Sequence, residues 1–349
     1  MKVLSLFDGM SCGQIALNRL KVDIETYYAA EIDKFAIEIT QKNYPDTIQL
    51  GDVTKWQDWD IDWSSIDLVS GGFPCQAWSI AGKQQGDRDP RGMLFWTMLD
   101  IIQNVLKHNP KAYFLMENVK MKQEFEQYIT KHTEAALGVV NKHLINSSLV
   151  SAQSRQRYYW TNIPNIVQPE DKGIILKDIL ESNPNNCVMM SDKFTTRNKD
   201  RNCLVDGTTK EKASNLSAME YLKNGRQGDY ISCDDEGTPI PNPELMRETP
   251  NYWQFDTSGK GYKSQQDRIR KLDVPSNTLS AGTASVPKIW YEQPKSYRKL
   301  TPTECERLQT VPDGYTEGVS NSQRYKMLGN GWTVDVIKHI YKFMLDNES

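Results

Sequence analysis

The chain lacks any apolar run long enough to cross a membrane. A spanning helix needs about 20 mostly apolar residues, and no stretch of these 349 residues approaches that length. The first segment meets an acidic residue, Asp8, before the apolar core of a secretory signal could form. These absences exclude a membrane protein, and they predict a cytoplasmic protein with no membrane partner.

Cysteine and histidine are few, and their spacing does not suit a metal. None of the six cysteines falls in a Cys-x-x-Cys pair, and the four histidines show no paired spacing for metal ligands. We therefore predict no metal, no structural zinc and no disulfide framework. The reducing cytoplasm expected from the missing signal fits this cysteine usage.

An excess of positive charge, which is typical of nucleic-acid-binding proteins, is also missing, because the net charge is −3. The total hides an uneven distribution. Residues 1–74 contain 6 Lys and Arg against 12 Asp and Glu, whereas the remaining 275 residues contain 36 against 33. An acidic first quarter is compatible with a cofactor-binding region that never meets phosphate, so a basic face elsewhere stays open.

Short apolar segments alternate with helical patterns in the first half of the chain. Strands are predicted at residues 3–7, 27–30, 68–70 and 112–116, and helices at residues 13–20, 33–43 and 92–107. Strands that alternate with helices favour an α/β fold, with a mostly parallel sheet covered on both faces.

The amino-acid composition changes between about residues 183 and 257. Polar residues, Pro and Gly dominate there, and apolar periodicity is weak. Helical patterns return at residues 303–310 and 333–345. We therefore predict an inserted irregular domain, after which the last helix returns to the first domain.

Three consecutive strand ends carry residues that suit an adenosyl ligand. The turn at residues 7–13 contains two glycines and opens a helix, where free N–H groups and a close backbone approach are available. Glu31 ends the second strand and suits a ribose diol, and Asp52 suits an adenine amino group. The alternative is that both carboxylates only cap helices. A dinucleotide fits less well, because the spacing is not Gly-x-Gly-x-x-Gly.

Cys75 follows an apolar run at residues 66–69 and stands directly behind a proline, where a strand should end. In an open α/β sheet, reacting groups gather at the carboxyl ends of the strands. A partly exposed thiol near the start of a helix favours the nucleophilic thiolate. The alternative for a lone cysteine is a small buried apolar residue.

These segments resemble motifs of the DNA (cytosine-5)-methyltransferase family, in the family's order and nearly end to end. The matches are Phe-Asp-Gly-x-x-x-Gly at 7–13, Glu31, Gly-Asp-Val at 51–53, Gly-Phe-Pro-Cys-Gln at 72–76, Glu-Asn-Val at 117–119, Gln-Ser-Arg-Gln-Arg at 153–157, Arg-Lys-Leu-Thr-Pro-Thr-Glu-x-x-Arg-Leu-Gln at 298–309 and Gly-Asn-Gly at 329–331. The resemblance implies a Rossmann-like mixed sheet of the S-adenosylmethionine-dependent methyltransferases, with an inserted irregular target-recognition domain. The implied division is a catalytic, cofactor-binding domain at 1–184 plus 323–349, with recognition domain and hinge at 185–322.

The resemblance also implies the catalytic set. Cys75 would be the nucleophile that adds to C6 of cytosine, and Glu117 the acid that faces ring N3. Arg157 and Arg155 would hold the base O2 or a neighbouring phosphate. The target base must leave the helical stack, and the loop at 76–91 would close over it through Gln76, Ser79, Lys83 and Arg91.

The implied cofactor is S-adenosyl-L-methionine, which leaves as S-adenosyl-L-homocysteine. The residues expected to hold it are Phe7, Asp8, Gly9, Ser11, Gly13, Glu31, Ile32, Asp52, Val53, Pro74, Leu94, Asn330, Gly331 and Trp332. The sequence departs from many bacterial members in two places. Ser11 and Cys12 stand where glycines are usual, as in the animal de novo enzymes, and Ile32 replaces a tryptophan that stacks on adenine in some relatives.

Double-stranded DNA is the expected partner, bound by a monomer in a bacterial or phage-infected cell. Pairing with a separate restriction endonuclease, a phage role and an orphan regulatory role are the alternatives. Residues 191–280 contain 14 Lys and Arg against 14 Asp and Glu, so the cations must segregate to bind phosphate. We expect Lys260, Lys263, Arg268 and Arg270 to face DNA, and the acidic turn at 234–236 to point away. Two alternatives are the tRNA-methylating branch, whose Cys-Phe-Thr signature is missing here, and a catalytically idle DNA-binding relative.

Overall fold

The computed structural model describes the two ends of the chain in most detail. Side chains are described for residues 1–74, 92–181 and 300–347, and between 204 and 299 the backbone of seven short strands is described. None of the helices in these described parts is long and apolar enough to cross a membrane.

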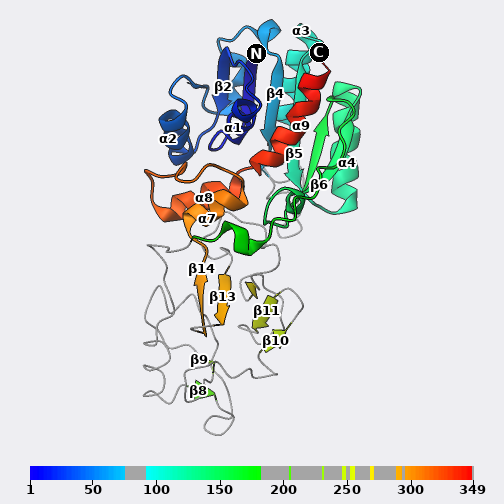
Figure 1. Cartoon of the computed structure of the whole chain (residues 1–349). Coiled ribbons are helices and arrows are strands. Elements are labelled where there is room, and N and C mark those ends of the chain that lie inside the picture. The colour runs from blue at the N-terminus through cyan, green and yellow to red at the C-terminus, as the bar shows by residue number, and fades with distance from the viewer. Residues whose placement is uncertain are drawn as a thin grey trace.

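A seven-stranded mixed sheet forms the centre of the larger body (Figure 1). Its strands are β1 (Lys2–Leu6), β2 (Thr26–Ala30), β3 (Ile48–Gln49), β4 (Leu68–Gly72), β5 (Tyr113–Val119), β6 (Asn141–Asn146) and β7 (Gln156–Thr161). They lie in the order β3-β2-β1-β4-β5-β7-β6. The first five are parallel, and β7 is antiparallel to both of its neighbours. The predicted α/β class and the mostly parallel sheet are confirmed.

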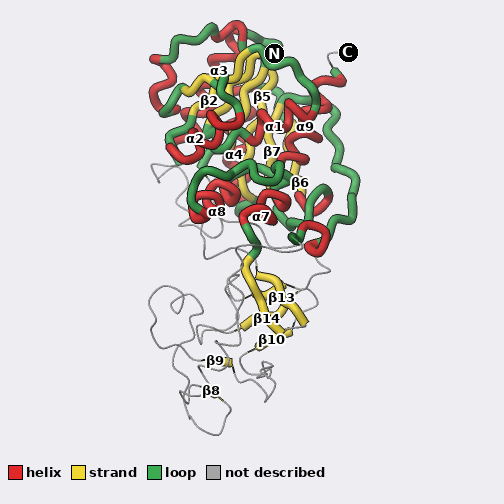
Figure 2. Tube along the Cα trace, turned by 60° about the vertical axis from the view of Figure 1, so that its left-hand side comes forward, coloured by secondary structure: helices red, strands yellow, loops and turns green. Residues whose placement is uncertain are grey.

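Helices cover both faces of this sheet, as the view in Figure 2 also shows. On one face lie α1 (Cys12–Arg19), α2 (Lys34–Asn43) and α9 (Val334–Asp346); on the other lie α3 (Leu94–His108) and α4 (Gln123–Leu137). Strand alternation serves both layers, because Val3 joins the first apolar cluster while Leu4 and Leu6 join the second.

Local signals explain where the helices begin. The Asp33 side chain accepts a hydrogen bond from the Phe35 N–H at 3.0 Å, so the predicted cap of α2 is confirmed. The buried positions of α3 recur at helical spacing, which directs one stripe of the helix into the core.

A second sheet lies within the inserted segment. It contains β10 (Met246–Glu248), β11 (Tyr252–Phe255), β12 (Arg268–Arg270), β13 (Lys288–Glu292) and β14 (Lys295–Lys299), in that order, and β8 (Leu204–Val205) pairs separately with β9 (Tyr230–Ile231). After β14 the chain enters α7 (Pro302–Leu308) and then α8 (Asn321–Asn330). Leu300, Cys305 and Leu308 are buried in the same cluster as α1 and α9, so this part of the predicted 185–322 segment packs on the sheet domain.

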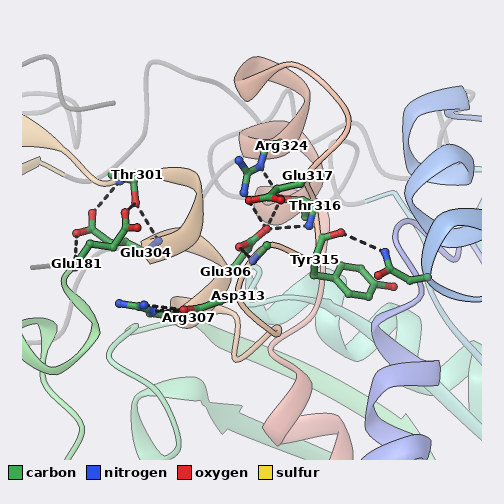
Figure 3. A network of polar contacts seen from close by, with 12 residues as sticks. Glu181, Thr301, Glu304, Glu306, Arg307, Asp313, Tyr315, Thr316, Glu317 and Arg324 are labelled. Atoms are coloured by element: carbon green, nitrogen blue, oxygen red, sulfur yellow. Dashed lines mark hydrogen bonds and ion pairs between the residues drawn. The ribbon is translucent and has the colours of Figure 1, made fainter. Parts of the chain in front are cut away.

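A polar network fixes the chain where it re-enters the sheet domain (Figure 3). Glu304 accepts hydrogen bonds from the backbone N–H groups of Thr301, at 2.8 Å, and Glu181, at 3.0 Å. The Thr301 hydroxyl donates to Glu181. The last described residue before the inserted segment is therefore tied to the first helix after it.

Candidate active site

Three strand termini meet at one edge of the sheet. In the parallel pair of β4 and β5, Gly72 lies opposite Glu117. Because β7 runs antiparallel to β5, it begins where β5 ends, and Arg157 lies opposite Val119. Diagonal neighbours in a sheet are within reach of long side chains, so the topology brings Glu117 and Arg157 together.

The Glu117 carboxylate has a donor at each oxygen. Arg157 Nε lies 3.0 Å from Oε1, and Trp332 Nε1 donates to Oε2 at 3.2 Å. The residue is 8% exposed, so the carboxylate is held in one orientation at the rim of the sheet. Charge-assisted contacts of this kind are stronger than neutral hydrogen bonds.

Gly72 makes room for this arrangement. A Cβ atom at this position would lie 2.7 Å from Glu117 Oε2 and 3.1 Å from Trp332 Nε1. Both are shorter than ordinary carbon contacts, so any side chain at position 72 would displace the carboxylate or the indole. The glycine before the Phe-Pro-Cys sequence is therefore required by space.

The predicted nucleophile follows this point closely along the chain. The buried Asn118 side chain donates to the Phe73 carbonyl at 3.0 Å, which anchors the chain two residues before Cys75. Pro74 is half-buried. Cys75 itself, and the predicted DNA contacts Gln76, Ser79, Lys83 and Arg91, lie outside the described residues.

Arg155 occupies a different environment from Arg157. Its side chain is buried and donates to the carbonyl oxygens of Gly329, at 3.3 Å, and Gly331, at 2.9 Å. Gln309 Nε2 donates to Leu328 O at 2.6 Å and to Gly331 O at 3.2 Å. Both side chains hold the end of α8 and the residues that follow it, a segment at 329–332 (the 329–332 loop) that carries Trp332. The geometry thus makes Arg155 a support for the 329–332 loop.

On the cofactor side, Glu31 links the first two strand ends. Its Oε2 atom accepts from the Gly9 N–H at 2.8 Å, and Oε1 accepts from the N–H groups of Ile32, at 2.7 Å, and Asp33, at 2.8 Å. Glu31 therefore organises the turn after β1 as well as the start of α2. These contacts fit the capping alternative, and they also fix the carboxylate beside Gly9.

The turn after β1 has an unusual backbone. Phe7, Gly9 and Ser11 have φ values of 54°, 61° and 60°, in the left-handed region. That conformation costs a non-glycine residue roughly 1–2 kcal/mol, and strain of this kind clusters at functional sites. A Cβ atom at Gly9 would meet no atom of the described residues within 4 Å, so open space lies beside the turn in this part of the structure.

Asp8 is a half-buried acid in this turn. Tyr27 Oη donates to Asp8 Oδ1 at 2.9 Å, and the Ser11 hydroxyl donates to Oδ2. Burial raises the pKa of Asp8 to about 6, although the hydrogen bonds from Ser11 and Tyr27 oppose that shift. Sequence reasoning missed Tyr27; the available signal was that a buried tyrosine hydroxyl needs a partner.

The other predicted cofactor residues lie around the same end of the sheet. The Asp52 side chain accepts from the Thr54 N–H at 2.9 Å and caps a short helical turn that begins at the buried Val53. Ile32 is 74% exposed, and Leu94 opens α3.

The carboxyl-terminal loop completes this end of the sheet. A Cβ at Gly331 would lie 3.0 Å from Met10 Cε and 3.3 Å from Cys12 Sγ, and one at Gly13 would lie 3.6 Å from Trp332 Cζ3. Asn330 is exposed. The first and last motifs of the chain therefore lie side by side.

In the inserted segment, Arg268 and Arg270 are the ends of β12, which lies between β11 and β13. Lys260, Lys263 and the acidic residues 234–236 lie outside the described residues. The predicted DNA face in this segment therefore stays a prediction.

Comparison with known proteins identifies the family of this chain. The family described as C-5 cytosine-specific DNA methylase matches residues 1–346. The chain belongs to this family. As a methylase of this kind it is a DNA (cytosine-5-)-methyltransferase, and the predicted family is confirmed.

Curated relatives match the methylase over almost its whole length. The Type II methyltransferase M.NlaX of Neisseria lactamica is 29% identical, with 98% of this chain and 96% of the relative covered. M.HhaI of Haemophilus parahaemolyticus is 29% identical, with 97% and 93% covered. Among solved structures, the Entamoeba histolytica methyltransferase EhMeth has a TM-score of 0.64 at 15% identity, covering 100% of this chain and 99% of that one. This last likeness concerns the fold.

Proposed function

We propose that this methylase transfers a methyl group from S-adenosyl-L-methionine to C5 of a cytosine that is flipped out of a specific double-stranded DNA sequence. The reaction would pass through a covalent bond between Cys75 and C6. The observation that carries this proposal is the pairing of Glu117 with Arg157 at the sheet edge, one strand from the segment that leads into Cys75.

Cytosine C5 is a weak nucleophile, which explains why a thiolate is needed. Addition of the Cys75 thiolate to C6 forms a sulfur–carbon bond and moves an electron pair toward C5 and N3. The bound cofactor supplies an activated methyl group, which C5 takes. Loss of the C5 proton to a base then restores the C5–C6 double bond and expels the thiolate.

Glu117 and Arg157 would act on the polar edge of the base. Glu117 is the group proposed to share a proton with N3 as negative charge develops there. Arg157 contacts Glu117 through Nε, and its Nη1 donates to the Gln156 carbonyl at 2.8 Å. The other guanidinium N–H groups suit the base O2 or a phosphate. Arg155 contributes by supporting the loop at 329–332.

The residues at the ends of β1 and β2 fit an adenosyl cofactor. The open space at Gly9 permits a ligand to approach the backbone, and the Glu31 carboxylate is held directly beside it. A carboxylate in that position suits a ribose diol. Exposed Ile32 and half-buried Asp52, at the neighbouring strand ends, suit the adenine. Asp8, Trp332 and the residues just before Trp332 suit the part of the cofactor beyond its ribose and adenine.

Target recognition is proposed for the inserted segment within residues 185–322, with Arg268 and Arg270 on β12 among the DNA contacts. Base-edge contacts in the grooves and DNA shape would supply its specificity. The relatives named Type II methyltransferases support a role in restriction–modification. The proposal adds a cytoplasmic location and a separate endonuclease.

Bisulfite sequencing of DNA from cells that express the protein tests the activity and reveals the target sequence together. We expect one methylated sequence with the wild type and none with Cys75→Ser, because a serine hydroxyl is too weakly ionised at neutral pH to add to C6. DNA with 5-fluorocytosine at the target should trap the wild type covalently, since fluorine cannot leave as a proton does.

Cys305→Ser is the matched control. Burial raises the pKa of the Cys305 thiol well above its usual value, so this thiol is not a nucleophile and its loss should leave trapping intact. Turnover by Cys75→Ser at the wild-type rate would overturn the proposed mechanism. Methylation of tRNA in place of DNA in the same cells would favour the alternative substrate.

A further inference from the structure

The indole of Trp332 connects two regions that are far apart along the chain. Its N–H donates to Glu117 Oε2 at 3.2 Å, across 215 positions of sequence. The ring is 8% exposed, and its other edge lies near Gly13 at the start of α1. One side chain therefore lies beside the start of α1, next to the turn after β1, and donates to the Glu117 carboxylate at the end of β5.

The loop that carries this indole is held firmly. Arg155 and Gln309 each donate to carbonyl oxygens on it. The next residue, Thr333, donates to Gln309 Oε1 at 2.8 Å and accepts from the Ser147 hydroxyl at 2.9 Å. All of these groups are buried. A donor on a rigid, buried loop has a fixed direction, which is the requirement for orienting another side chain.

The opposite side of the carboxylate is equally constrained. Arg157 Nε contacts Oε1, and the absence of a side chain at Gly72 leaves only the space that Oε2 occupies. Without the indole N–H, Oε2 would lose the one donor that it has among the described residues, and the carboxylate could rotate about its last bond. Arg157 alone fixes one oxygen.

We infer that Trp332 is a positioning residue for Glu117, whose indole N–H holds the carboxylate in the orientation that meets the base. This inference rests on the proposed function, because it needs Glu117 to act on the substrate. It gives the Trp332 N–H a role beyond the packing of its ring beside the cofactor turn.

A double-mutant cycle tests the inference. Trp332→Phe keeps an aromatic ring but replaces the indole with a smaller ring that lacks the N–H donor. At saturating DNA and S-adenosylmethionine we expect it to lower the single-turnover methylation rate about tenfold, and to change cofactor affinity by less than about threefold; tenfold corresponds to about 1.4 kcal/mol. In a Glu117→Ala background, where no carboxylate remains to orient, Trp332→Phe should change the rate by less than about twofold.

Trp160→Phe is the matched control for the loss of an indole donor. Trp160 is fully buried in the same sheet and donates to Thr130 at 2.8 Å, away from the reaction edge. We expect this variant to lose stability and to keep the saturating rate. A tenfold loss in that control would overturn the inference, because any lost indole bond would then have the same effect.

Two other outcomes separate the inference from the proposed function. An equal loss for Trp332→Phe in both backgrounds, or a loss that appears only as weaker cofactor binding, overturns the positioning role and leaves the proposed function intact. An unchanged rate for Glu117→Ala alone contradicts the proposed function itself, and the inference fails with it.

Discussion

Two buried glutamates, each beside an arginine, occupy different regions of this methylase and differ in how completely their oxygens are used. Glu306, in the α7–α8 region, is 0% exposed and accepts from Gly314 N, Thr316 N, the Thr316 hydroxyl and Arg324 Nη2 (Figure 3). Glu117, at the sheet edge, is 8% exposed and has two donors among the residues whose side chains the structure describes, Arg157 and Trp332.

Under the proposed function, this difference separates a structural carboxylate, Glu306, from one that would meet a substrate, Glu117. An ionised carboxylate offers about four acceptor sites. The four donors of Glu306 come from one short segment, so the carboxylate holds that segment in its folded shape. The two donors of Glu117 come from distant elements, and they fix its orientation while acceptor capacity remains. Burial beside an arginine therefore does not by itself identify a catalytic group.

The largest expected effects come from changing each glutamate to the glutamine of the same size. Glu117→Gln should lower the saturating methylation rate by about 10²–10⁴, the range for losing an acid–base group. It should lower the unfolding free energy by less than Glu306→Gln does, because fewer donors lose a charged acceptor. Glu306→Gln should lower the unfolding free energy by about 3–5 kcal/mol, because Arg324 is left buried without its counter-charge.

Denaturant unfolding and single-turnover kinetics on both variants test whether Glu117 matters mainly for rate and Glu306 mainly for stability. The distinction between the two glutamates is wrong if Glu117→Gln destabilises the protein as much as Glu306→Gln does. It is also wrong if Glu306→Gln, measured well below its unfolding midpoint, loses as much rate as Glu117→Gln.

A smaller effect is expected for Glu31, which combines features of both glutamates because it accepts three backbone N–H groups and faces open space. Glu31→Ala should weaken S-adenosylmethionine binding about ten- to a hundredfold, since a charge-assisted hydrogen bond is worth roughly 1.5–3 kcal/mol. Isothermal calorimetry without DNA measures this directly.

Asp33→Ala is the control for Glu31, because Asp33 caps the same helix through the Phe35 N–H. Losing that cap costs typically about 1 kcal/mol of stability, and cofactor affinity should stay unchanged. If the two alanine variants bind the cofactor equally well, Glu31 is a cap and not a ligand.

The smallest effect concerns Asp8 and pH. Burial raises the pKa of Asp8 from 3.8 to about 6 in the folded protein, so between these values the folded state binds more protons than the unfolded state. The contribution of Asp8 to stability is therefore complete below about pH 4 and is lost as the pH rises through about 6. Unfolding free energies across this window should fall with pH less steeply in Asp8→Asn than in wild type. Equal slopes would remove Asp8 as the cause.

Much of this architecture could be predicted because its signals are local. Short apolar segments predicted β1, β2, β4 and β5. The glycines and acids at 7–13, 31 and 52 indicated the strand ends that carry the candidate site. The segments of α4, β6, β7 and α8 were not predicted. The place of β7, between β5 and β6, depends on pairing between distant strands, and hydrophobic periodicity does not specify which strands pair.

The sequence by itself determined which residue types stand at the strand ends, since strands and turns follow from local periodicity and backbone preference. Only the tertiary structure decided the partners of those residues. Arg155 and Arg157 are two positions apart, yet Arg157 pairs with Glu117 at the start of β7 while Arg155, just before the strand, lies under the 329–332 loop. That loop delivers Trp332 to Glu117 because the last helix returns to pack on α1, a contact that depends on the whole core being assembled.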